Sequence, residues 1–238
     1  RMREALARGA TRGAASRASS AARATRSRVT RRRARVSAMA ARAADDARAR
    51  ANCFVENPRE GEIANADVGG ARGGRLRGLR VAVKDNVAVR GLRAGAGNPT
   101  YLETIGKDAA EAHASCARKV LDEGAVFVGK THMDELAWSL QGENFHYGTP
   151  KNARGNAPGK IPGGSSSGSA SAVCNDLADI AIGTDTIGSV RLPASFCGLY
   201  GARPTHGRVE TDGVVPLSHS FDTVGWFAKD AKTLRVLG

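Results

Sequence analysis

The stretch GGSSSGSASAVCNDLADIAIGTDTIGSVRLPASFCG (residues 163–198) decides the fold of the chain. Its pattern predicts a turn rich in glycine and serine, a helix over Ser167–Leu177, a short apolar strand over Asp179–Ile182 and a second turn that ends at Ser189. Small residues allow the close backbone approach that a site built from main-chain N–H groups requires. Because apolar, foldable sequence interrupts the stretch, it indicates a catalytic pocket rather than a flexible linker.

Strands and helices alternate outside this stretch as well. The apolar run Leu79–Val83 predicts a strand whose carboxyl end presents Lys84. Apolar residues recur at helical spacing over Asp108–Glu123, and Ala125–Gly129 follows as a compact strand. A further helix is expected over Met133–Leu140. This alternation is typical of the α/β class.

The net charge of +13 on the 238 residues is concentrated at one end. Residues 1–50 contain 15 arginines, no lysine and only three acidic residues, whereas the rest of the chain is nearly neutral. A nucleic-acid-binding domain would carry its basic residues on the folded face. We therefore expect no nucleic-acid partner. We interpret residues 1–50 as a basic Arg/Ala/Ser-rich tail, disordered or transit-peptide-like, ahead of a single domain over residues 51–238.

Several familiar motifs are absent or misleading. The four cysteines and five histidines lack metal-ligand or redox spacing. Gly124–Thr131 matches the spacing of an ATP-binding phosphate loop, but its four inner residues (AVFV) predict a strand. Gly164–Gly168 matches the G-x-S-x-G motif, but a predicted loop precedes it instead of the required strand. No apolar run is long enough to span a membrane. We expect no cofactor, no metal and no membrane span.

Hydroxyl groups and one lysine remain as candidate catalytic groups. A serine nucleophile needs a neighbouring base, and a lysine held neutral by burial can take that role. Lys84 follows apolar or small residues at a strand end, although an ion-paired Lys84 is the alternative interpretation. Asp185 lies in the tight turn GTDT, where we expect it to brace the loop rather than act as a base.

Four motifs occur together in an order and spacing that resemble the amidase signature family: VAVKDN, GKTHMDELAWSLQGEN, PGGSSSGSASAV and GTDTIGSVRLPASFCGLYGARPT. The resemblance runs from about Leu79 to Asp230. It implies a mixed β-sheet core flanked by helices. Because members of the family are considerably longer, it also implies that residues 51–238 are the N-terminal part of one amidase domain, truncated at the C-terminus.

The resemblance also implies a Ser–cis-Ser–Lys triad. Ser189 corresponds to the nucleophile that forms the acyl-enzyme, Ser165 to the bridging serine with its cis peptide bond, and Lys84 to the base. The oxyanion hole corresponds to backbone N–H groups of one turn: Thr186, Ile187 and Gly188, together with Ser189.

The activity implied by the resemblance is hydrolysis of a small carboxamide to carboxylate and ammonia. Indole-3-acetamide, a precursor in auxin biosynthesis, is the leading substrate, and Leu192, Phe196 and Trp226 are candidates for apolar lining. Two alternatives stay open: the A subunit of a tRNA-dependent amidotransferase, and a catalytically silent amidase-like domain of a plastid import receptor. We expect an intracellular protein, cytoplasmic or plastid, whose partner is a small amide, and we leave a homodimer open.

Overall fold

The computed structural model describes residues 30, 45–47, 49, 51–55, 73–154 and 160–238. The basic tail predicted over residues 1–50 lies almost wholly outside the described residues, so its boundary stays a prediction. Residues Arg48–Gly238 form one compact unit. None of the helices in the described residues has the length and apolar character that crossing a membrane requires.

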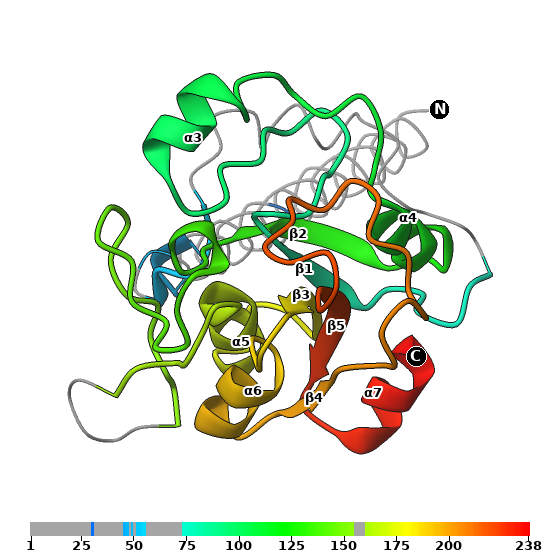
Figure 1. The fold of residues 1–238 in the computed structure, drawn as a ribbon. Coiled ribbons are helices and arrows are strands. Elements are labelled where there is room, and N and C mark those ends of the chain that lie inside the picture. Colours follow the sequence, from blue (N-terminus) through cyan, green and yellow to red (C-terminus); the bar gives the residue numbers. More distant parts are fainter. Residues whose placement is uncertain (1–29, 31–44, 48, 50, 56–72, 155–159) are drawn as a thin grey trace, which may run out of the picture. The chain divides into compact units, whose positions relative to one another are not determined.

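The core of this unit is a five-stranded sheet in the order β2-β1-β3-β5-β4 (Figure 1). The strands are β1 (Arg80–Lys84), β2 (Val126–Thr131), β3 (Ile180–Asp185), β4 (Tyr200–Ala202) and β5 (Thr223–Ala228). Strand β1 pairs in parallel with β2 and β3, whereas β5 is antiparallel to both β3 and β4. The mixed sheet of the α/β class is therefore confirmed.

Helices cover both faces of the sheet (Figure 1). They are α3 (Pro99–Thr104), α4 (Ser115–Asp122), the 3-10 helix η1 (Glu135–Ala137), α5 (Ser167–Cys174), α6 (Arg191–Cys197) and α7 (Ala231–Leu237). Alternate strand residues face opposite sides. Ala82 and Ala181 pack with α5 and α6 on one face. On the other face, Val81 and Ile180 belong to the core that α4 and α7 cover.

The carboxyl ends of the parallel strands meet at one edge of the sheet. Lys84, Thr131 and Asp185 are the last residues of β1, β2 and β3. The register pairs Val83 with Ile182, which brings Lys84 beside the end of β3. In open α/β sheets this edge is where ligands bind. The sheet therefore collects the predicted residues of the site at its carboxyl edge.

The helix predicted over Asp108–Glu123 is wrong in its first half, because α4 begins only at Ser115. The backbone N–H of Ala114 donates to the carbonyl of Ala88 (3.0 Å). Before Ser115 the backbone therefore hydrogen-bonds to this neighbouring loop instead of forming a helix.

The helix predicted over Met133–Leu140 is also wrong, since only the single turn η1 forms there. Leu136 and Ala137 have φ angles of 50° and 61°. Such left-handed conformations cannot continue a right-handed helix. The segment instead folds as a loop beside the carboxyl edge of the sheet.

Both rejected motifs have the structure expected for them. The segment that matches the phosphate-loop spacing contains β2, so its N–H groups belong to the sheet. The described residues 160–166, which precede α5, contain no strand.

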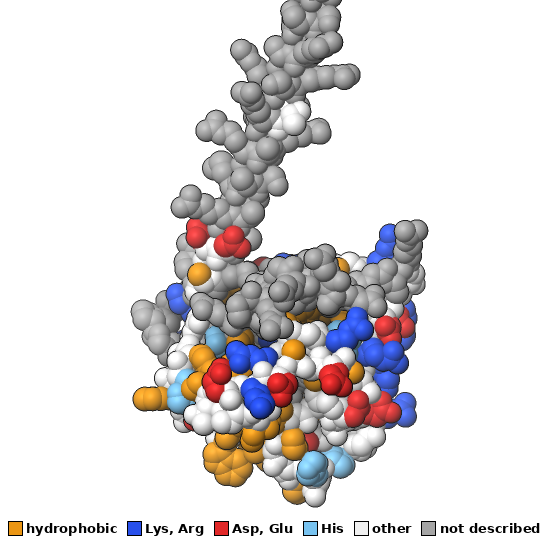
Figure 2. Space-filling view, turned by 90° about the horizontal axis from the view of Figure 1, so that it is seen from above, with side chains coloured by type: hydrophobic (Ala, Val, Ile, Leu, Met, Phe, Trp, Pro, Cys, Tyr) orange, Lys and Arg blue, Asp and Glu red, His pale blue; other side chains and the backbone are white. Residues whose placement is uncertain are grey.

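On the face shown in Figure 2, Lys and Arg side chains lie among Asp and Glu side chains.

Candidate active site

Lys84 lies at the carboxyl end of β1 with its side chain fully buried. Its Nζ donates to Ser165 Oγ at 2.8 Å and to Thr184 Oγ1 at 2.7 Å. Burial lowers the pKa of Lys84 from 10.5 to about 7, and nearby carboxylate charges oppose that shift. A sizeable share of the amine is therefore neutral near pH 7, as a general base must be.

Thr184 is a member of this cluster that the sequence analysis missed. Its hydroxyl accepts hydrogen bonds from Lys84 Nζ and from Asn86 Nδ2 (3.2 Å). The parallel pairing of β1 with β3 could have identified it. Val83 pairs with Ile182 in that register, and Thr184, two residues after Ile182, therefore lies beside Lys84. Thr184 fixes the direction of the amine.

Ser165 follows a cis peptide bond between Gly164 and Ser165. The loop before it is held by backbone bonds: Gly164 N–H donates to the carbonyl of Leu140 (2.8 Å), and Asp134 N–H donates to the carbonyl of Ser165 (3.1 Å). The Ser165 side chain is buried. The loop thus presents the hydroxyl to Lys84 at the start of α5.

Ser189 lies in the turn between β3 and α6 and is 2% exposed. Its carbonyl accepts a hydrogen bond from the N–H of Ser166 (3.2 Å), which joins the two serine-bearing turns. The Ser166 hydroxyl also donates to the carbonyl of Thr184 (3.2 Å). Among the described residues no hydrogen bond joins the hydroxyls of Ser165 and Ser189. The structure therefore brings the turns together and pairs Lys84 directly with Ser165.

Asp185 braces the turn that carries Ser189, as its position in GTDT predicts. The carboxylate is completely buried and accepts from the N–H groups of Gly188 (2.9 Å), Val190 (3.0 Å) and Arg191 (3.2 Å). The guanidinium of Arg191 binds it as well, at 2.9 and 3.1 Å. Burial alone would raise the pKa of Asp185, but these hydrogen bonds hold it below its usual value. Asp185 is therefore an ionised brace.

The expected oxyanion hole is only partly free in this structure. The N–H of Gly188 already donates to Asp185. This leaves the N–H groups of Thr186, Ile187 and Ser189 as the candidates from the prediction. The Ile187 side chain is 69% exposed beside them.

A second buried lysine lies behind the site. Lys130, on β2, donates to the carbonyls of Asp85 (3.1 Å) and Val87 (2.7 Å), and its Nζ lies 3.5 Å from Asp85 Oδ1. Asp85 Oδ2 accepts from the N–H of Gly95 (3.0 Å). Both charged side chains are buried. The pair ties the residues that follow Lys84 to β2 and to the next loop.

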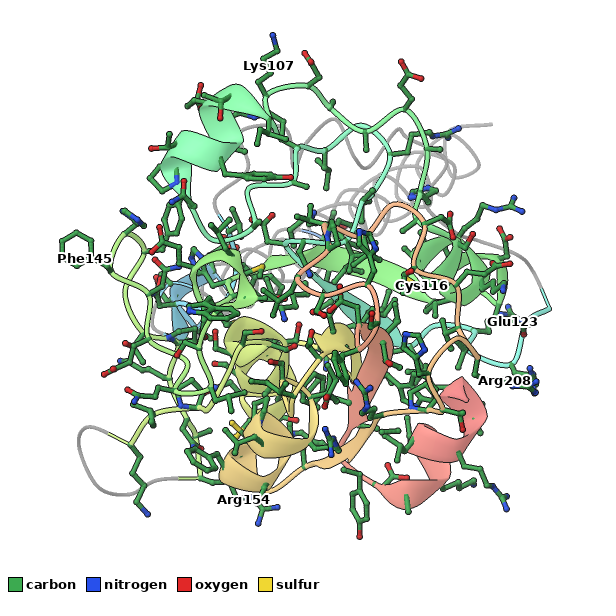
Figure 3. All side chains as sticks on the ribbon, in the orientation of Figure 1. Lys107, Cys116, Glu123, Phe145, Arg154 and Arg208 are labelled. Atoms are coloured by element: carbon green, nitrogen blue, oxygen red, sulfur yellow. The ribbon has the colours of Figure 1, made fainter. Side chains whose placement is uncertain are left out.

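The three candidates for apolar lining lie in different surroundings. Phe196 is 44% exposed on α6, close to Gly163. The indole N–H of Trp226 donates to the carbonyl of Leu234 (3.2 Å), so this ring packs against α7. Leu192 is half-buried on α6. Phe145 projects outward from the loop after η1 and is 95% exposed (Figure 3).

Metal-ligating side chains do not gather at this site. In the part of the chain that the structure describes, no group of three His, Cys, Asp or Glu residues could hold a metal ion. Burial lowers the pKa of His132 to about 4, and its ring stacks on Tyr147. His132 is therefore a neutral packing residue.

The fold and this site define an α/β protein with a buried lysine–serine pair at the carboxyl edge of its sheet. The sequence matches the Amidase family over residues 24–237, and the chain belongs to that family. One solved structure, described as an amidase, superposes with a TM-score of 0.68 at 32% identity, over 82% of this chain and 46% of that chain.

Three curated relatives illustrate the range of the family. Amidase 1 of Arabidopsis thaliana is 53% identical over 68% of this chain and 37% of its own length. Outer envelope protein 64, chloroplastic, of the same plant is 43% identical over 68% of this chain and 27% of its own length. Indoleacetamide hydrolase of Pseudomonas savastanoi is 42% identical over 77% of this chain and 39% of its own length. The chain thus spans well under half the length of these relatives.

Proposed function

We propose that this protein hydrolyses the C–N bond of a small carboxamide through Lys84, Ser165 and Ser189. The observation that carries the proposal is the 2.8 Å contact between the buried Lys84 amine and the Ser165 hydroxyl. A structural lysine would more often be ionised and paired with a carboxylate. Here the amine contacts two hydroxyls and its pKa is lowered to about 7.

In the proposed mechanism, neutral Lys84 accepts the proton of Ser165 while Ser165 removes the proton of Ser189. Ser189 Oγ then attacks the amide carbon, and the carbonyl oxygen becomes an oxyanion. Backbone N–H groups of Thr186, Ile187 and Ser189 stabilise that charge; one such donor contributes about 3–4 kcal/mol. The relay returns its proton to the leaving nitrogen, which departs as ammonia. Water, deprotonated by the same relay, cleaves the ester to give the carboxylate and free Ser189.

Indole-3-acetamide is the substrate that we propose. It rests on a bacterial relative named indoleacetamide hydrolase, which is 42% identical to this chain; amidase 1, at 53% identity, supports amide hydrolysis in general. Ile187, exposed and next to the expected oxyanion donors, offers an apolar contact for an aromatic acyl group. Partial exposure of Phe196 near the serine loop is in keeping with that role.

A silent, partner-binding domain is the second candidate function. It is favoured by the 43% identity to chloroplastic outer envelope protein 64. Ser189 separates the two proposals, because a domain that only binds a partner needs no nucleophile. An intact lysine–serine pair has no evident use in a domain that only binds a partner.

Ammonia release by the full-length protein tests this choice. We expect the wild type to release ammonia from indole-3-acetamide and the Ser189→Ala variant to release none above background. Ser195→Ala, which alters an exposed serine on α6, is the matched control and should retain wild-type activity. A wild type that is inactive on indole-3-acetamide and on simpler carboxamides would favour the silent binding domain.

Location and assembly are separate proposals. We propose that residues 1–50 direct the protein to plastids, with the cytoplasm as the alternative, because Arg, Ala and Ser dominate this tail. A fluorescent protein fused to residues 1–50 should then enter plastids in plant cells, whereas diffuse fluorescence would favour the cytoplasm. The proposed homodimer should appear as twice the monomer mass in sedimentation equilibrium.

A further inference from the structure

Asp134 is a buried carboxylate beside the serine loop that the mechanism does not use. Its exposed fraction is 0%, and it lies in the loop between β2 and η1. One oxygen, Oδ2, accepts from the N–H of Gly142 (2.9 Å). The other, Oδ1, has no hydrogen-bond partner among the described residues. A buried, half-satisfied carboxylate is costly, so its presence calls for a function.

Both the backbone and the side chain of Asp134 contact the loop that presents Ser165. Its N–H donates to the Ser165 carbonyl (3.1 Å). Its carboxylate packs so closely on Gly164 that a methyl group at that position would collide with it. Gly142, which Asp134 binds, in turn packs against the carbonyl of Gly163. Asp134 therefore touches the serine loop over three successive residues, directly or through Gly142.

The charge of Asp134 also acts on Lys84. Three carboxylates face the amine: Asp134 from the loop after β2, Asp185 from the end of β3, and Asp222 from the segment before β5. Each raises the pKa of Lys84 against the larger lowering by burial, and Asp134 has the largest effect of the three.

The other two carboxylates have partners that compensate their charge. Two arginines and three backbone N–H groups bind Asp185. The Thr186 hydroxyl (2.6 Å) and the N–H groups of Leu217 and Ser218 bind Asp222. Asp134 has one N–H donor for two oxygens. It is thus the least compensated of the carboxylates that act on Lys84.

We propose that Asp134 is a positioning residue that fixes the Gly164–Ser165 loop against Lys84 and supplies a negative charge that favours the protonated form of the amine. This proposal deepens the proposed amidase function and rests on it for its consequences in catalysis. A base that returns a proton to the leaving group must be able to hold one. The charge of Asp134 favours the protonated amine of Lys84, whereas burial favours the neutral amine.

The first test replaces the charge and keeps the shape. In Asp134→Asn we expect the acidic limb of the kcat/KM profile to move to lower pH by about 0.5–1 unit, because the protonated amine loses a stabilising charge. Asp134→Ser is a second neutral variant in case the amide does not fit. Glu143→Gln, which neutralises an exposed carboxylate in the same loop, is the control and should leave the profile unchanged.

A titration that needs no turnover separates this proposal from the proposed function. The pKa of Lys84 can be followed by NMR in protein labelled at the lysine side chains, with Lys84→Met to assign the resonance. We expect a lower pKa in both neutral variants of Asp134 than in the wild type, whether or not the protein hydrolyses amides. An unchanged pKa of Lys84 in a folded Asp134 variant would overturn the role of its charge.

A double-variant cycle tests the contact with Gly164. Gly164 has no positive φ, so only the collision with Asp134 should disfavour alanine there. We expect Gly164→Ala to lower the melting temperature strongly in the wild type and at least twofold less in the Asp134→Ala background, which lacks the colliding atoms. Equal losses in the two backgrounds would overturn the packing half of the proposal.

Discussion

The Lys84 amine donates a hydrogen bond to the Ser165 hydroxyl at 2.8 Å, although 81 residues separate the two in the chain. The sheet supplies one partner at the carboxyl end of β1, and the loop before α5 supplies the other. Among the described residues Lys84 forms no direct ion pair, and its amine instead contacts the hydroxyls of Ser165 and Thr184.

The pH dependence of activity should report the neutral form of Lys84. Burial lowers its pKa to about 7 in the folded protein. Below that pH the amine is protonated and cannot accept the proton of Ser165, so kcat/KM should fall with decreasing pH through an apparent pKa of about 7. A profile of initial rates between pH 5 and 9 would check this, because it extends roughly two pH units to each side of the expected pKa. A flat profile would exclude Lys84 as the base.

Removing the brace under Ser189 should cost both stability and activity. Asp185→Ala leaves three backbone N–H groups without their acceptor and Arg203 without its carboxylate partner. A buried backbone N–H group left without an acceptor typically destabilises a protein by about 1–3 kcal/mol. Urea unfolding would measure this loss. An Asp185→Ala variant as stable as the wild type would show that the turn does not depend on the brace.

The buried Lys130–Asp85 pair should be important for folding rather than for chemistry. Lys130→Met removes the cation and leaves Asp85 buried with backbone N–H donors alone. We expect a decrease of about 3 kcal/mol or more in the free energy of unfolding. Thermal unfolding checks this, with Lys119→Met on the exposed face of α4 as the control. The double variant Lys130→Met/Asp85→Asn should recover part of the loss.

Thr184 should affect catalysis through the direction of the Lys84 amine. Thr184→Val keeps the shape of the side chain but removes one of the two acceptors of Lys84 Nζ. Because the amine then has one fixed contact instead of two, we expect kcat to fall by roughly tenfold with little change in KM. Steady-state kinetics separates the two constants. A change in KM alone would assign Thr184 to substrate binding instead.

Strands β1, β2 and β3 could be predicted from the sequence, because each contains a short apolar run that ends at polar or glycine residues, whereas β4 and β5 were not predicted. Lys84 could be placed at a strand end for the same reason. The segment Met133–Leu140 could not be predicted correctly, because its helical spacing gives no sign that Leu136 and Ala137 adopt positive φ. Local periodicity indicates which residues are apolar, but tertiary hydrogen bonds determine the backbone conformation of this segment.

For the site, too, the sequence indicated the residue types, and tertiary packing determined their contacts. Motifs indicated which residues to consider, whereas the register between β1 and β3 and the packing of the loop before α5 determined which of them meet. Asp134 gave no signal as a lone acidic residue, since its closeness to Gly164 depends on how two loops pack. The hydrogen bond from Gly188 to Asp185 was likewise outside what spacing alone can indicate.

The most direct test of the account is the rate of ammonia release by full-length Lys84→Ala measured beside wild type and beside Lys107→Ala, an exposed lysine at the surface (Figure 3). If Lys84 is the base, Lys107→Ala retains wild-type activity and Lys84→Ala, although folded, loses at least about a thousandfold in kcat. A folded Lys84→Ala variant that hydrolyses the amide as fast as wild type would contradict that role of Lys84.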